Sequence, residues 1–327
     1  MEYKKKLLQL FRSKNLNNIQ LGIQLLDSIP ELAPLREQLL PTPQEQAFLD
    51  EQFFGKRWQE PPMEGGLWLL FLTELEAKQR NVFFTCDEKR YFIQTDLDFS
   101  LVLKYALNLE QLEIKKQQQP QLLELLGQQQ PPLKTLIVEQ VELFSIPESI
   151  QYLHDLEVLA LVDNGLQELP PALFELKQLK TLFLSHNQLE ELPSAIGQLA
   201  HLQKLALDHN QLIKLPASLG QLQKLVHLNV DNNLLLSLPN NLFLCSQLQY
   251  LSANYNYFRQ LSSNIHQLQQ LQYLYVGHNH LSSLPSCLGK LQQLKELKIQ
   301  ENPLSKLPKS LWTISGLKME GAKREHF

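Results

Sequence analysis

The chain has 327 residues, 43% of them hydrophobic, and carries 30 basic and 34 acidic side chains for a formal net charge of −4. A chain of this length is expected to form more than one structural part, and its hydrophobic fraction argues against wholesale disorder. The balanced charge lacks the basic excess of a nucleic-acid-binding surface. The three cysteines lie far apart without CxxC spacing, which argues against a disulfide framework and a thiolate zinc site.

The N-terminus lacks the features of a secretory signal. Its short apolar run is interrupted by Gln9 and ended by Arg12, and no small-residue cleavage site follows. The longest apolar stretch, residues 66–72, is far shorter than the roughly 20 residues that span a bilayer. We therefore expect a cytoplasmic protein without a membrane span, and export by a route that needs no cleavable signal is the alternative.

Residues 1–108 are predicted to form a mostly helical N-terminal region. Apolar residues recur at helical spacing over 2–13, 16–29, 42–54 and 67–79. Two short runs, 81–85 and 90–95, indicate strands. We expect this region to cap the repeat array that follows; an independent module with its own partner is the alternative.

Residues 109–132 are interpreted as a degenerate repeat or a linker. Leu109, Leu112 and Ile114 hold the places that the hydrophobic residues of a repeat would need. The glutamine-rich runs at 115–121 and 127–132 are expected to form loops.

Residues 133–316 repeat every 23 residues without an insertion. The consensus is LxxLxLxxNxLxxLPxxLxxLxx, and its eight copies, called turns one to eight below, begin at Leu133, Leu156, Leu179, Leu202, Leu225, Leu248, Leu271 and Leu294. Asparagine fills the ninth place in seven consecutive turns, at Asn164, Asn187, Asn210, Asn233, Asn256, Asn279 and Asn302. Proline fills the fifteenth place in every turn but the sixth, where Ser262 stands.

This pattern resembles the leucine-rich-repeat family. The 23-residue form with the LP pair is similar to the intracellular, Ras-group type found in eukaryotic scaffolds and in many bacterial proteins. The resemblance implies an α/β solenoid with a curved parallel β-sheet on its concave face and short 3₁₀ or extended segments on its convex side. Residues 317–327 are predicted to form a C-terminal cap and tail.

The physics of the repeat leads to the same expectation. The alternation in LxxLxL predicts a short strand whose leucines point inward and whose other side chains point outward. A single turn cannot bury its own leucines, so neighbouring turns must stack and share one core. The asparagines can donate to and accept from backbone groups of the turns, and we expect them to form a ladder inside the solenoid.

No phosphate-binding loop, metalloprotease, hydrolase or zinc motif is present in the sequence. We therefore expect neither an enzyme nor a cofactor. His186 and His209 hold the same place in adjacent turns with Asp208 alongside, so a metal could be imagined there. Imidazoles on a broad sheet are more often solvated interface residues, and the sequence offers no third soft ligand, so we predict no metal site.

Aromatic residues gather at outward-facing places of turns six and seven. Tyrosine is enriched at interfaces because it offers a large contact area with a polar tip and little rotamer entropy to lose. The alternative is cross-strand stacking that only stabilises the sheet. We predict a partner-binding surface made of Phe183, Asp208, His227, Asp231, Tyr250, Tyr255, Tyr257, Tyr273, Tyr275 and His278.

The sequence thus predicts a protein–protein interaction scaffold that binds a partner through its concave face. A glycan is the alternative ligand, because stacked aromatic rings beside aspartate and asparagine also suit sugar rings. The lack of a secretion signal favours a protein partner.

Overall fold

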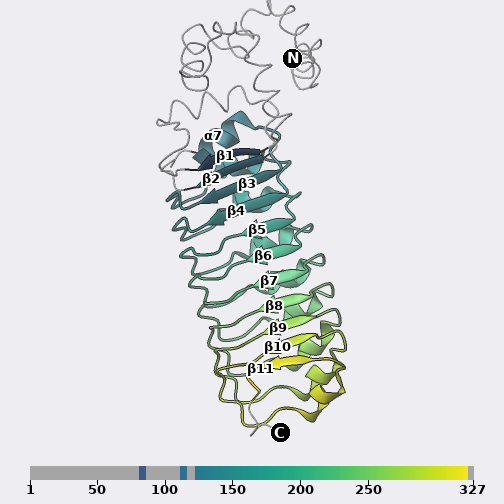
Figure 1. The fold of residues 1–327 in the computed structure, drawn as a ribbon. Coiled ribbons are helices and arrows are strands. Elements are labelled where there is room, and N and C mark those ends of the chain that lie inside the picture. Colours follow the sequence, from purple (N-terminus) through teal and green to yellow (C-terminus); the bar gives the residue numbers. More distant parts are fainter. Residues whose placement is uncertain (1–80, 86–110, 116–121, 323–327) are drawn as a thin grey trace, which may run out of the picture.

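The computed structural model describes residues 81–85, 111–115 and 122–322. The helices expected within residues 1–80 and the strand expected at 90–95 lie outside these residues. The described part is a solenoid whose strands lie one above another, with short helices along one side of the stack (Figure 1). The α/β leucine-rich-repeat architecture expected from the sequence is confirmed.

The described elements alternate between strands and short helices. The strands are β1 (Asn81–Thr85), β2 (Gln111–Lys115), β3 (Thr135–Glu139), β4 (Val158–Val162), β5 (Thr181–Phe183), β6 (Lys204–Ala206), β7 (His227–Asn229), β8 (Tyr250–Ser252), β9 (Tyr273–Tyr275), β10 (Glu296–Lys298) and β11 (Lys318–Glu320). The α-helix is α7 (Leu122–Gln129), and the 3₁₀ helices are η3 (Glu148–Tyr152), η4 (Pro171–Glu175), η5 (Ser194–Gln198), η6 (Ala217–Gln221), η7 (Asn240–Leu244), η8 (Ser263–Gln267), η9 (Ser286–Lys290) and η10 (Lys309–Thr313).

The strands form one parallel sheet in chain order. Between β5 and β10 the partners are offset by one repeat, so Leu182 pairs with Leu205 and Leu205 with Leu228. These leucines are fully buried and belong to one continuous core. A central leucine between two outward-facing residues makes each of these three-residue strands one-sided, as the alternating pattern predicts.

The sheet extends beyond the eight repeats at both ends. The strand expected at residues 81–85 is present as β1, which pairs with β2, and β2 pairs with β3. At the other end, β11 pairs with β10 and lies within the segment interpreted as the cap. The repeat array therefore shares its sheet with β1 and β11, which lie outside the eight repeats, and with β2, in which Leu112 and Ile114 pair with the consensus places Leu136 and Val138.

The asparagine ladder is present inside the solenoid. Asn187, for example, donates from Nδ2 to the carbonyl of Leu161 in the preceding turn at 2.7 Å and to that of Leu184 in its own turn at 2.9 Å. Its Oδ1 accepts from the backbone N–H groups of Asn164 and Leu166. Each asparagine therefore joins neighbouring turns by satisfying backbone groups that the bend leaves without a strand partner.

The convex side consists of 3₁₀ helices that follow the LP pair, as expected. Each proline of that column lies in extended conformation directly before its helix, where its missing N–H and fixed φ cost nothing. In the sixth turn Ser262 takes this place, and its hydroxyl accepts from the Asn264 N–H. A capping hydroxyl thus replaces proline at the one exception.

One loop expectation is wrong in part. The run at 127–132 was predicted to be a loop, but Gly127, Gln128 and Gln129 complete α7, because glutamine is a good helix former. Gly127 also packs so closely against Ser149 of η3 that a Cβ would lie 2.5 Å from it.

No helix among the described residues is long and apolar enough to cross a membrane.

The eighth place of every turn has a left-handed backbone. Its φ values run from 52° to 57° at Gln140, Asp163, His186, His209, Asn232, Tyr255, His278 and Glu301. Asparagine, aspartate and histidine tolerate this conformation better than other side chains do, and they hold five of the eight places. The left-handed residue turns the chain out of the strand and sends its side chain to the rim of the concave face.

Candidate functional site

Four rings lie against one another on the concave face and are called the aromatic cluster here: His227, Tyr250, Tyr273 and Tyr275. The sheet register places His227 beside Tyr250 and Tyr250 beside Tyr273. His227 and Tyr250 stack with ring centroids 4.0 Å apart, and Tyr250 meets Tyr275 edge to face at 5.3 Å. Tyr273 lies 6.1 Å from Tyr250. The rings are half-buried, so each keeps one surface open to solvent.

Charged groups border the aromatic cluster on the side of β10. The Tyr275 hydroxyl donates to Glu296 Oε2 at 2.8 Å, and Lys298 Nζ lies 4.9 Å from the centre of the Tyr275 ring. Burial, followed by the hydrogen bond to Glu296, raises the pKa of Tyr275, and burial also raises the pKa of Tyr250. Both phenols therefore remain protonated at neutral pH and can donate hydrogen bonds.

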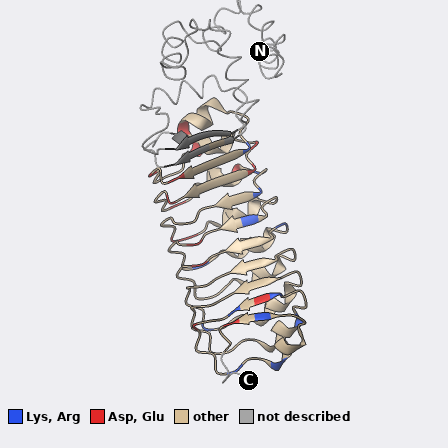
Figure 2. Cartoon of the chain, viewed as in Figure 1, with Lys and Arg blue, Asp and Glu red and all other residues tan. Residues whose placement is uncertain are grey.

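The strands from β4 to β9 carry almost no formal charge, whereas β10 beside them carries Glu296 and Lys298 (Figure 2). From β4 to β9, Lys204 is the one lysine, arginine, aspartate or glutamate within a strand. Burial, and next to it the charge of Lys204, lowers the pKa of His227. A neutral His227 stacked on Tyr250 therefore extends the uncharged surface.

The two aspartates of the predicted surface hydrogen-bond to neighbouring turns. Asp231 accepts from the Ser252 hydroxyl at 2.7 and 2.8 Å and from the backbone N–H of Asn254 at 2.6 Å. Its pKa is raised, because burial outweighs these hydrogen bonds. Asp208 accepts from Ser185 at 2.6 Å and from Asn229 at 2.9 Å. Both carboxylates thus join adjacent strands, a role that the linear pattern did not reveal.

Three further predicted residues lie on the rim, where the chain leaves the strands. Tyr255 stacks on His278 with centroids 4.0 Å apart, and Tyr257 lies 5.7 Å from the ring of His280. Tyr255 and Tyr257 are 51% and 46% exposed. Both line a hollow of about 800 Å³. Phe183 is separate from this group, since it lies in β5 between Ala160 and Ala206 of the adjacent strands.

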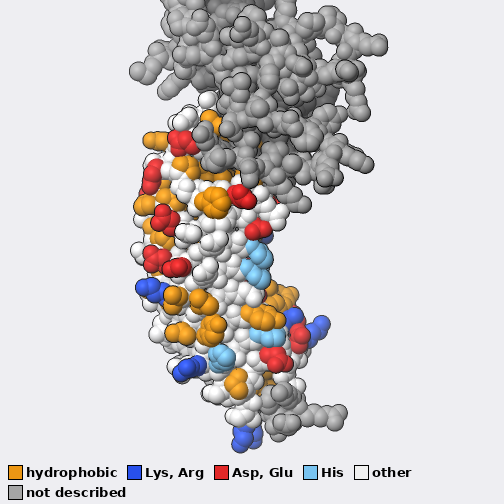
Figure 3. Space-filling view, turned by 90° about the vertical axis from the view of Figure 1, so that its left-hand side faces the viewer, with side chains coloured by type: hydrophobic (Ala, Val, Ile, Leu, Met, Phe, Trp, Pro, Cys, Tyr) orange, Lys and Arg blue, Asp and Glu red, His pale blue; other side chains and the backbone are white. Residues whose placement is uncertain are grey.

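An apolar edge next to this rim was missed in the sequence. Leu236 and Ile213 are 63% and 55% exposed, and Leu234, which is 41% exposed, lines the same hollow as Tyr257. Figure 3 shows hydrophobic side chains gathered over the lower half of this edge, with acidic side chains above them. The signal was available: isoleucine or leucine stands at the twelfth place of turns four and five, and leucine at the tenth place of turn five, where turn three holds glutamate and glutamine.

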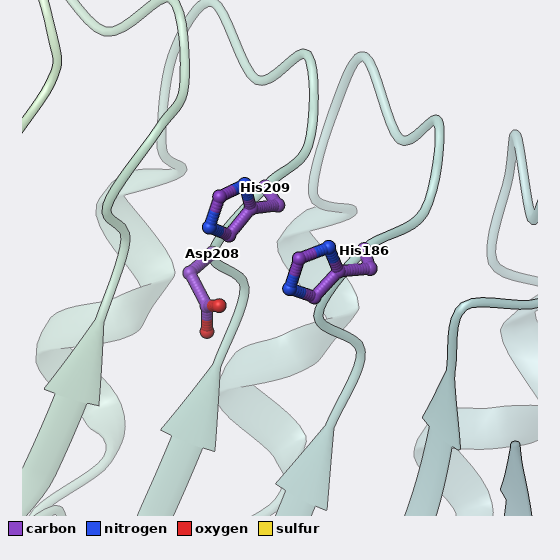
Figure 4. Close-up of side chains that lie close together, drawn as sticks. All are labelled: His186, Asp208 and His209. Atoms are coloured by element: carbon purple, nitrogen blue, oxygen red, sulfur yellow. The ribbon is translucent and has the colours of Figure 1, made fainter.

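His186, Asp208 and His209 are the three residues brought together at the other part of the rim. The two imidazole rings stack with centroids 4.0 Å apart and planes 11° from parallel. Figure 4 shows the rings side by side on neighbouring turns, with the Asp208 carboxylate next to them. One ligand atom from each of the three residues lies within 4.8 Å of the others.

Comparison with known families agrees with the repeat. One leucine-rich-repeat family model matches residues 154–212, and a second matches residues 270–291. Together with the one-sided parallel sheet and the asparagine ladder, these matches decide the family. The chain is a leucine-rich-repeat protein. The 23-residue intracellular subtype stays a prediction. No curated protein sequence matches the chain.

Several solved structures resemble this leucine-rich-repeat protein. A leucine-rich-repeat protein of Leptospira interrogans is 26% identical with a TM-score of 0.58, and the match covers 75% of this chain and 68% of that one. The plant peptide hormone receptor RGFR1 in complex with RGF2 is 22% identical, with a TM-score of 0.53 and coverages of 67% and 40%. The Drosophila Toll–Spatzle complex is 19% identical, with a TM-score of 0.54 and coverages of 68% and 34%.

Proposed function

We propose that this leucine-rich-repeat protein binds a protein partner through its concave face, with the aromatic cluster at the centre of the contact. The single observation that carries the proposal is the packing of His227, Tyr250, Tyr273 and Tyr275 into one half-buried group on strands β7 to β9, which contain no lysine, arginine, aspartate or glutamate. The centres of protein interfaces are depleted of charge and enriched in tyrosine, as this surface is.

The cluster is suited to binding because its rings are already held in place. Tyr250 contacts rings on both neighbouring strands, and Tyr275 is fixed by its hydrogen bond to Glu296. A side chain that is ordered before binding loses less rotamer entropy when the partner arrives. The Tyr275 hydroxyl proton is already donated to Glu296, whereas the Tyr250 phenol keeps a proton that can be donated to a partner's carbonyl or carboxylate.

The contact extends over the rim towards Tyr255, Tyr257 and His278, and on to the apolar edge at Leu234 and Leu236. This edge exposes large apolar side chains whose burial is favourable only against another molecule. Asp208 and Asp231 support the surface from within by holding adjacent strands together. Phe183 lies outside the centre and would contact only a partner that reaches β5.

Two solenoids of the same fold, the plant receptor and Toll, are in complexes with RGF2 and Spatzle. The likeness to these proteins extends to the fold alone. The proposal therefore rests on the aromatic cluster of this chain and not on their ligands.

The test is a double variant, Tyr250→Ala with Tyr275→Ala, compared with Tyr152→Ala as a matched control. Tyr152 is a 46% exposed tyrosine at the end of η3 on the convex side. Proteins retained by wild type and by the control but lost by the double variant are identified by mass spectrometry, and their Kd values are measured by calorimetry. We expect the double variant to weaken binding by about 2–4 kcal/mol, which is roughly 30- to 1000-fold.

The double variant should remain folded, because the rings point away from the leucine core. It loses four ring pairs, each worth ~0.5–1.5 kcal/mol, so circular dichroism must show that it is folded before its Kd is compared. An unchanged Kd in the folded double variant would overturn the proposal. Equal loss of binding in Tyr152→Ala would do the same, because it would place the interface elsewhere. A glycan that binds wild type through the same tyrosines, with no protein retained, would establish the alternative ligand class.

A further inference from the structure

We propose that His186, Asp208 and His209 form a binding site for a late first-row divalent cation, with zinc as the first probe. The prediction of no metal rested on the solvated character of imidazoles on a broad sheet and on the lack of a third soft ligand. The structure brings the Asp208 carboxylate, a hard oxygen ligand, within 4.8 Å of a nitrogen of each imidazole. Two imidazoles and one carboxylate are a donor set that zinc accepts, with water completing the tetrahedron. This site is separate from the aromatic cluster and does not depend on the proposed partner.

The backbone brings the two histidines together. Both occupy the left-handed eighth place, in turns three and four. The backbone N–H of His186 donates to the carbonyl of Asp208 at 2.9 Å, and that of His209 donates to the carbonyl of Asp231 at 2.9 Å. These bonds hold the Cα atoms of the two histidines about one strand spacing apart, ~4.8 Å. The two imidazoles therefore project from adjacent backbone positions that are both fixed.

The distances allow coordination after a small side-chain movement. Two atoms bound to one tetrahedral zinc at about 2.0–2.1 Å lie roughly 3.4 Å apart. The ligand atoms here lie within 4.8 Å of one another, so they need to approach by at most about 1.4 Å. Both histidines are exposed, which leaves their rings room to rotate out of the parallel stack.

Asp208 is the anchored ligand. Its Oδ1 accepts from Ser185 and Asn229, and these hydrogen bonds orient the whole carboxylate. Outer groups that orient a ligand in this way raise metal affinity. Metal binding through His209 Nε2 would break one hydrogen bond. Asn232 Nδ2 lies 3.3 Å from His209 Nε2, and a bound cation would take its place.

Ring stacking alone does not define a metal site, because other pairs of rings in neighbouring turns stack at the same distance. His227 on Tyr250 and Tyr255 on His278 both have centroids 4.0 Å apart, yet each pair contains a single imidazole. The His186 and His209 pair differs because it offers two nitrogen ligands beside a carboxylate. His278, which holds the same eighth place, therefore provides the matched control.

The experiment titrates the full chain, first freed of metal with a chelator, with zinc chloride alone in a calorimeter. We expect one zinc per chain. Because removing an outer group that only orients a ligand already costs 10- to 100-fold, loss of a direct ligand in His186→Ala or His209→Ala should weaken binding at least about tenfold. His278→Ala should leave the affinity unchanged.

Asp208→Asn should also weaken zinc binding, and its melting temperature without metal shows whether the strands are still held. Copper(II) provides a second readout, because its electron paramagnetic resonance spectrum should show two nitrogen ligands in wild type and one in His209→Ala. The proposal is overturned if His278→Ala loses as much affinity as His186→Ala. It is also overturned if wild type binds zinc no more tightly than the His186→Ala, His209→Ala double variant.

Discussion

Replacing Asn210 by alanine removes the asparagine ladder from one turn in the middle of the array. The buried amide donates to the carbonyl oxygens of Leu184 and Leu207 at 2.9 and 3.0 Å. Its Oδ1 accepts from the backbone N–H of Leu189 at 3.0 Å. Three buried backbone groups in two turns therefore depend on this one side chain.

The cost follows from what each backbone group keeps after the change. The Leu184 carbonyl still accepts from Asn187, and the Leu207 carbonyl still accepts from Asn233. The Leu189 N–H loses its acceptor, and a buried N–H without an acceptor costs ~1–3 kcal/mol. We expect Asn210→Ala to lower the free energy of unfolding by about 2 kcal/mol.

The assay is urea unfolding followed by circular dichroism, with the midpoint and slope fitted together. Gln211→Ala is the matched control, because its side chain is exposed and the change should stay within about 0.5 kcal/mol. Hydrogen exchange at the Leu189 amide gives a local readout and should accelerate in Asn210→Ala alone. Equal unfolding midpoints for the two variants would refute the reasoning, since the ladder would then contribute nothing.

Two further predictions concern titratable groups. Burial lowers the pKa of His227 in the folded protein, so protonation of this histidine favours the unfolded chain. The free energy of unfolding is therefore highest above about pH 6.5, the ordinary pKa of histidine, and decreases as the pH falls below that value. The drop in melting temperature between pH 7.5 and pH 5.5 should therefore be smaller in His227→Gln than in wild type. An equal drop in the two proteins would contradict the lowered pKa. Burial raises the pKa of the Cys245 thiol to about 11, so iodoacetamide at pH 8 should alkylate half-buried Cys287 in the native protein and reach Cys245 only in urea. Mass spectrometry of the digested protein measures both, and equal labelling of the two cysteines in the native state would show that Cys245 is not protected.

The sequence predicted the backbone of the repeats well because the same pattern is repeated eight times. Placing Leu182, Leu205 and Leu228 in one column fixes which strands pair, and with it that Tyr250 lies beside Tyr273. A strict 23-residue period leaves one register that buries the leucines of the consensus columns. Register, core and ladder therefore follow from spacing alone.

The roles of individual polar side chains did not follow from spacing. Asp231 was expected to be an acidic contact, but it accepts hydrogen bonds from Ser252 and Asn254, whose donors come from the next turn. Such pairings depend on rotamers and on competition between donors, which a column of letters does not encode. The apolar edge at Leu236 was overlooked for another reason: the twelfth place, where Leu236 is exposed, is a variable position of the consensus outside the strand.

The asparagine ladder also has a consequence for how the solenoid folds. Its hydrogen bonds between turns join residues only 21 to 26 positions apart, as from Asn210 to Leu184 and Leu189. Strand pairing between β5 and β10 likewise joins residues one repeat apart. Because no contact of this kind needs a distant part of the chain, loop closure costs little at each step. Any two adjacent turns can serve as a nucleus, and order then spreads along the chain in both directions, one turn at a time.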